Sequence, residues 1–244
     1  MSLIGEGFTW LNDVESYKGP DGVIHLAASH LEVTVISMGL AAAVSLPLGI
    51  ALGHIRRGGP LVTLLANATR AVPTLGLLYL LAEFPTFGVS EKTAIISLAI
   101  FAIPPMLTNA WAGLSTVEPE AVEAARGLGM SQREILWRVE LPLSVPLIFA
   151  GVRSSTLQTF ATATIASFVG TDTLGKLIQL GQAAGAPGQG EVLGAAIVIA
   201  VLAIVLDIIL AIVQRRLTPA PLRSRTITIR RQKARLPEVV ADVG

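Results

Sequence analysis

Residues 115–142 read STVEPEAVEAARGLGMSQREILWRVELP and form a polar interval between two long apolar runs. Local signals predict two short helices within this interval. Pro119 suits the first turn of a helix, where its missing N–H costs nothing, and the glycines around Gly129 end that helix. Ser131 and Glu134 make an S-x-x-E capping box, which opens the second helix. The interval is therefore predicted to be a helix, a glycine turn and a second helix, exposed to water.

Small apolar side chains recur at helical spacing along the first of these predicted helices. They are Ala121, Ala124, Ala125 and Leu128. A narrow stripe made mostly of methyl groups suits the groove of a partner protein. From the residues alone, an amphipathic loop that rests on the membrane surface is an equally good interpretation.

Five apolar runs of about 20 residues lie outside this interval, and a helix of that length crosses the ~30 Å hydrocarbon core of a bilayer. The runs are 31–53, 61–82, 93–114, 143–169 and 192–213. They are continuously apolar and lack the alternation of barrel strands. Of the 244 residues, 52% are hydrophobic and 14% charged. These features predict an all-α, polytopic integral membrane protein with about five transmembrane helices.

Arginine and lysine predict the orientation, because they concentrate in cytoplasmic segments of membrane proteins. They crowd into 54–60, into 115–142 and into the segment after residue 213, whereas other loops carry only Lys18, Lys92 and Lys176. We therefore expect a multi-pass protein of the cytoplasmic (inner) membrane, with the N-terminus outside and the C-terminus inside. The expected organisation is an external segment 1–30, a transmembrane domain 31–217 that contains the cytoplasmic loop 115–142, and a basic cytoplasmic tail 218–244.

Enzyme chemistry finds no support in the sequence. Cysteine is absent, and the three histidines lack metal-ligand spacing. Residues 170–177, GTDTLGKL, fit GxxxxGK but end in Leu177, where a phosphate loop needs Ser or Thr. We expect no metal or cofactor to bind this chain, no catalytic residue, and no nucleic-acid partner. The lipid bilayer is its expected surrounding.

Several features suggest a pathway through the spans rather than an inert anchor. Prolines that would kink or interrupt helices occur at 47, 73, 104, 105 and 146. Arg70 and Asp207 are charges inside apolar runs, which suits either a functional site or a structural pair. Threonines of the fourth run either line a cavity or bond back to their own helix. The candidate pathway residues are Arg70, Pro73, Asn109, Gln158, Thr159 and Thr162.

The central loop resembles the EAA loop in membrane subunits of binding-protein-dependent ABC importers. The resemblance rests on Glu123-Ala124-Ala125, Gly129, Val139 and Leu141-Pro142, where the family has Ile or a similar aliphatic residue at the position of Val139. In that family the loop supplies a coupling helix that sits in a cleft of the ATPase subunit. The implied fold is the type I permease fold, and Pro142 is expected to fix the turn into the fourth span. With the stripe included, the candidate ATPase-coupling residues are Ala121, Glu123, Ala124, Ala125, Leu128, Gly129, Leu141 and Pro142.

Residues 31–213 further resemble the osmoprotectant branch of these permeases. The matching phrases are RAVPTL at 70–75, Asn109 and VELP at 139–142, whereas Asp172 and Thr173 stand where the branch has glycines. This resemblance implies import of glycine betaine, choline or carnitine. It also implies three partners: a separate ATPase that uses ATP and Mg²⁺, an extracytoplasmic binding protein, and a second permease copy or homologue.

Two alternatives remain open at this point. One is a permease for another small solute, such as an amino acid. The other is a self-sufficient secondary transporter, a class that favours an internal repeat of spans and acidic relay residues inside the membrane. Five spans do not divide into equal halves, and Asp207 is the clear acid within them.

Overall fold

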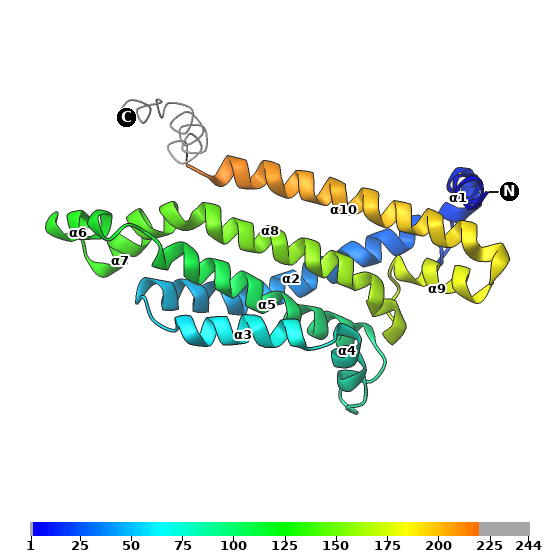
Figure 1. Cartoon of the computed structure of the whole chain (residues 1–244), viewed down its shortest axis with the longest axis horizontal. Helices are drawn as coiled ribbons and strands as arrows, with labels where there is room; N and C mark the ends of the chain where they lie inside the picture. Colours follow the sequence, from blue (N-terminus) through cyan, green and yellow to red (C-terminus); the bar gives the residue numbers. More distant parts are fainter. Residues whose placement is uncertain (1, 220–244) are drawn as a thin grey trace, which may run out of the picture.

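The computed structural model describes residues 2–219, except for the side chain of Arg70. Within this part the fold is all-α, and long helices run side by side along the long axis of the molecule (Figure 1). Four of them are long and apolar enough to cross a membrane. They are α2 (Val23–His54), α5 (Glu91–Ser115), α8 (Leu141–Ala166) and α10 (Gln189–Leu217). For α8, the span also includes the helical turns that flank it. The predicted count of five is reached if a bent pair of shorter helices forms one more span.

That bent pair occupies the apolar run 61–82, in which Pro73 was predicted to kink or interrupt the helix. It consists of α3 (Gly59–Ala71) and α4 (Thr74–Ala82), whose axes differ by 84°. Val72 has an extended backbone, as expected for the residue before a proline, because the ring of Pro73 clashes with a helical predecessor. The other four prolines of the predicted spans stay inside α2, α5 and α8.

Short helices cover one end of the molecule, and the sequence did not predict them. α1 (Leu3–Asn12) and the 3₁₀ turn Val14–Tyr17 lie in the segment expected to be a plain external extension, and α9 (Gly175–Ala183) follows the fourth span. α1 packs on the start of α10, where a Cβ added to Gly194 would come within 2.2 Å of the Trp10 ring. Figure 1 shows α1, α4 and α9 gathered at the end opposite α6 (Pro119–Gly127) and α7 (Gln132–Ile135).

The core is built by α2, α5 and α8. Met38 and Ala41 of α2 form a buried cluster with Ala102 and Met106 of α5. The GxxxG pair lets α2 approach α5 closely: a Cβ at Gly49 would lie 2.6 Å from the Ala110 Cβ. The pair therefore serves contact within the chain. By contrast, the most apolar stretch of α10 has no buried residue, which suits a helix facing lipid.

Candidate functional site

The central loop has the predicted helix, glycine turn and second helix, as α6 and α7. Gly129 lies between them in the left-handed region, at φ +81°. The N–H of Met130 bonds to the Ala125 carbonyl at 3.2 Å, which closes the C-terminal end of α6. A Cβ on Gly129 would meet no atom of this chain within 4 Å. Glycine is therefore needed here for its backbone conformation, and the space around it is open to a partner.

The capping box at the start of α7 is formed as predicted. The Ser131 N–H donates to Glu134 Oε2 at 2.9 Å, and the Glu134 N–H donates to Ser131 Oγ at 3.4 Å. These reciprocal bonds satisfy N–H groups that the first turn of a helix leaves without partners. They fix the direction in which the chain leaves the glycine turn.

The predicted methyl stripe is divided between two faces. Ala125 is only 6% exposed and packs into this chain, and Ala121 is half-buried. Leu128 is 84% exposed, and Glu123 and Ala124 are exposed as well. The prediction that all four stripe residues share one outward face was wrong. Consecutive residues of a helix point about 100° apart, so Ala124 and Ala125 lie at opposite edges of the stripe. One edge therefore faces water while the other packs into the chain.

The turn expected at Pro142 is also absent. A π-helical turn, Leu136–Glu140, joins α7 to α8 in one continuous helix. The Leu141 N–H bonds to the Leu136 carbonyl, five residues back. A π turn widens the helix and accommodates a proline that lacks an N–H and would clash with the preceding turn. Leu141 and Pro142 therefore sit inside a continuous helical connection rather than at a corner.

A cavity of about 290 Å³ lies between α3, α5 and α8. Hydroxyl and amide groups share its walls with apolar groups; the lining residues are Ala66, Thr69, Phe101, Pro105, Thr108, Asn109, Ser154 and Gln158. Two predicted pathway residues, Asn109 and Gln158, thus meet in one cavity. Asn109 Nδ2 donates to the Pro105 carbonyl at 2.8 Å, which holds the amide against α5.

The remaining predicted pathway residues do not line this cavity. Thr159 is 2% exposed and its hydroxyl faces Met38 Sδ of α2 at 3.6 Å. Thr162 bonds back to the Gln158 carbonyl at 2.7 Å. Pro73 marks the break between α3 and α4, and the side chain of Arg70 lies outside the described part. Among residues 2–219, no cluster of His, Asp or Glu is placed to hold a metal ion.

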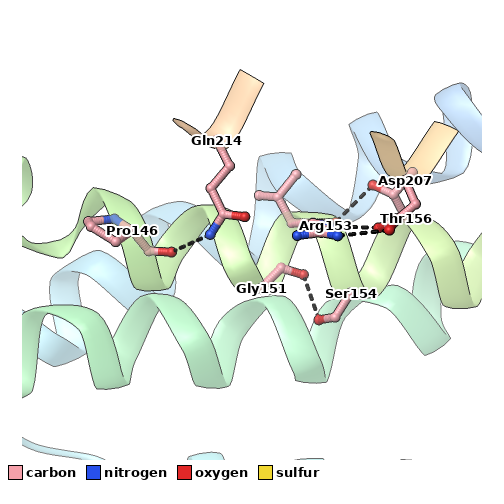
Figure 2. A network of polar contacts seen from close by, with 8 residues as sticks. Pro146, Gly151, Arg153, Ser154, Thr156, Asp207 and Gln214 are labelled. Atoms are coloured by element: carbon pink, nitrogen blue, oxygen red, sulfur yellow. Dashed lines mark hydrogen bonds and ion pairs between the residues drawn. The ribbon is translucent and has the colours of Figure 1, made fainter. Parts of the chain in front are cut away.

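The spans contain an ion pair that was not predicted from the sequence. Arg153 of α8 binds both carboxylate oxygens of Asp207 of α10, at 2.6 and 2.8 Å (Figure 2). Nearby, Gln214 donates to the Pro146 carbonyl at 3.1 Å. Asp207 is therefore paired with Arg153. The signal was present in the sequence, because the fourth apolar run holds one basic residue and the fifth one acidic residue.

The residues that depart from the glycines of the osmoprotectant branch have structural partners at the other end of the molecule. Asp172 binds Lys176 at 2.7 Å, and Asp21 binds the same ammonium at 2.8 Å. The hydrogen bonds of Asp172 and then Asp21 raise the pKa of Lys176. Thr173 is buried and donates to the Ala163 carbonyl at 3.0 Å. These contacts help to close the corner between α8 and α9, together with Gly170, which has φ +77°.

Residues 45–219 match the family described as binding-protein-dependent transport system inner membrane component. The chain belongs to this family of permeases. The permease is thus a multi-pass inner-membrane component of an ABC transporter, in which a separate subunit hydrolyses ATP. The predicted family, the all-α fold and the non-catalytic role are confirmed.

Characterised relatives match the permease over most of its length. It is 33% identical to the glycine betaine/carnitine/choline transport system permease protein OpuCB of Bacillus subtilis, over 87% of this chain and 97% of that protein. It is also 33% identical to the glycine betaine/proline betaine transport system permease protein ProW of Escherichia coli, over 67% of this chain and 45% of ProW.

The fold of the permease is also seen in a solved structure of the MetNI methionine ABC transporter in an inward-facing conformation. The TM-score is 0.70, with 19% identity, over 81% of this chain and 96% of that one. At this identity the likeness concerns the fold alone.

Proposed function

We propose that this permease imports a small osmoprotectant, such as glycine betaine, choline or carnitine, which a separate extracytoplasmic binding protein delivers. The observation that carries this proposal is the 33% identity to a Bacillus subtilis permease for these three solutes, spanning 97% of that relative. A second relative, the choline permease OpuBB of the same organism, is also 33% identical, over 81% of this chain.

The cavity between α3, α5 and α8 fits a transient stop on the pathway for such a solute. Its volume of about 290 Å³ falls near the lower end of small-molecule pockets. Phe101 is the one aromatic residue in its lining, whereas tight binding of a quaternary ammonium needs a cage of several rings. Tight binding is therefore assigned to the binding protein. Asn109 and Gln158 remain proposed pathway residues, and Thr159 is set aside because it faces α2.

An uptake measurement tests the substrate. The host gene is deleted in a strain that lacks other osmoprotectant carriers, and uptake of labelled glycine betaine, choline, carnitine and methionine is compared. Uptake of at least one quaternary amine should disappear while methionine uptake is unchanged. Unchanged uptake of all three quaternary amines would reject the osmoprotectant assignment, and loss of methionine uptake would favour an amino-acid permease.

The outward face of α6 and the glycine turn is the proposed docking site of the ATPase. We call the exposed residues Glu123, Ala124, Leu128 and Gly129 the docking face. An 84% exposed leucine beside a glycine with open space around it is costly in water and suited to burial in a partner's groove. Ala121, Ala125, Leu141 and Pro142 then support this face from within the chain.

A charge placed on the docking face tests this assignment. Leu128→Asp should leave insertion and thermal stability of the permease unchanged, because the side chain touches little of its own chain. Binding of the ATPase should weaken by about 30-fold to 1,000-fold, which corresponds to about 2–4 kcal/mol. The matched control is Val89→Asp, at an exposed valine of the opposite end. Equal retention of the ATPase by both purified variants would reject the docking face.

A further inference from the structure

The turn between α2 and α3 lies against the point where the central loop returns to the spans. His54 is the last residue of α2, and its Nδ1 hydrogen-bonds to Oε2 of Glu140, the last residue of the π turn. Glu140 is only 2% exposed. A carboxylate this deeply buried is unfavourable unless it is paired, so the contact with His54 holds two distant segments together.

The same turn also holds the other end of the loop. Arg56 Nη2 donates to the Val117 carbonyl at 2.8 Å, just before α6 begins. Trp111 Nε1 of α5 donates to the Arg57 carbonyl at 2.9 Å. Residues 54–57, which we call the clamp, therefore contact the segments on both sides of α6 and α7.

Backbone conformation and packing indicate that the clamp is a rigid joint. Arg56 has φ +52°, and it is the only non-glycine residue with positive φ in the described part of the chain. Such a conformation persists only where the surrounding contacts impose it. Next to it, Gly53 approaches α5 so closely that a Cβ would lie 2.8 Å from both the Leu114 Cβ and the Trp111 carbonyl oxygen. A displacement of the loop base therefore cannot be absorbed locally.

The geometry points to a second mechanical connection between the central loop and the spans. One connection is covalent and runs from α7 through the π turn into α8. The other runs through the clamp, in which His54 and Glu140 act as positioning residues that carry movement of the loop to α2 and α3. This inference rests on the proposed docking of the ATPase on the loop. Because the clamp contacts the loop at both of its ends, α2 and α3 would move together with the loop.

Variants of the hydrogen-bonded His54–Glu140 pair test this inference in the purified complex with its ATPase and binding protein. His54→Ala and Glu140→Gln should keep the ATPase bound and its basal hydrolysis intact. Transport, and the stimulation of hydrolysis by loaded binding protein, should fall about tenfold, within the range of coupling between sites in proteins. Because the two residues form one link, the double variant should be no worse than either single variant. His25→Ala, at the exposed opposite end of α2, is the matched control and should behave as wild type.

The outcomes separate this inference from the docking proposal. Wild-type transport by both single variants, or losses that multiply in the double variant, would overturn the clamp. Loss of the ATPase from these variants would also overturn it, since the pair would then serve docking. Failure of the docking proposal would be recognised by a different result, namely that the Leu128→Asp variant retains the ATPase. If the pair variants do not insert, Arg56→Ala serves as the test, because it removes an exposed side chain together with its hydrogen bond to the Val117 carbonyl. Transport should then fall with the ATPase still bound, and wild-type transport would overturn the clamp.

Discussion

Gly129 and Ala125 belong to the same short motif, but different physical reasons explain them. Gly129 has φ +81°, where a Cβ costs about 1–2 kcal/mol, and open space surrounds it. Ala125 has an ordinary helical backbone and is buried in its own chain. The spacing of the motif includes both residues and does not distinguish their roles. The structure separates the residue that shapes the turn from the residue that anchors α6.

Stability measurements distinguish these two roles. Ala125→Trp should lower the thermal stability of the isolated permease, because a ring in a filled site costs about 1–3 kcal/mol through displaced neighbours. Leu128→Trp adds the same ring on the exposed side and should leave the melting temperature unchanged. Thermal unfolding of the two purified variants without ATPase checks this. Equal melting temperatures would contradict the inward orientation of Ala125.

The bidentate pair of Arg153 and Asp207 makes a prediction of its own. Arg153→Ala or Asp207→Ala leaves one charge within the spans without its partner, which is unfavourable in an apolar environment. Each single variant should therefore melt lower than the charge-exchanged variant Arg153→Asp/Asp207→Arg. A thermal shift series in detergent and in lipid measures the order. An exchanged variant that is less stable than both single variants would show that the pair is not what holds α10 to α8.

At the scale of elements, the sequence predicts structure well where the signal is local. The capping box and the glycine turn define α6 and α7 correctly, because each depends on a few neighbouring residues. α1 and α9 were missed because short helices gain their stability from tertiary packing, here α1 on α10 through Trp10 and Gly194. Pro142 was misjudged since a π turn, not a corner, accommodates it.

The packing of α2 on α5 can be tested at two glycines of the same helix. A Cβ at Gly49 would lie 2.9 Å from the Leu107 carbonyl oxygen, whereas a Cβ at Gly39 would meet nothing within 4 Å. Gly49→Ala should destabilise the permease by about 1–3 kcal/mol, since backbone must shift. Gly39→Ala should be neutral or stabilising, because alanine favours a helix. Thermal unfolding of the two purified variants measures the difference. Equal changes in melting temperature would contradict the close α2–α5 contact.

At the scale of the whole molecule, the segments predicted on opposite sides of the membrane lie at opposite ends (Figure 1), and the orientation itself stays a prediction. α6 and α7 lie at one end in Figure 1, and α1, α4 and α9 lie at the other. The tail 218–244 was predicted to be cytoplasmic, and its residues 220–244 lie outside the described part. Sequence gives the family and the pathway candidates, but not the cavity, because Asn109 and Gln158 meet only through the packing of α5 on α8.

The orientation can be measured directly because the chain contains no cysteine. Val89→Cys places a thiol on the 70% exposed turn between α4 and α5, and Leu128→Cys places one on the central loop. An impermeant maleimide applied to intact cells should label the first variant and spare the second until the cells are opened. Labelling of Leu128→Cys in intact cells would reverse the proposed topology.

The central claim is that the ATPase docks on the central loop, and crosslinking tests it most directly. The complex is assembled with either Leu128→Cys or Val89→Cys and treated with a short thiol-to-amine crosslinker. We predict that Leu128→Cys yields a covalent product whose mass is that of permease plus ATPase, and that Val89→Cys yields none. An intact complex in which Leu128→Cys gives no such product, while Val89→Cys does, would contradict the account.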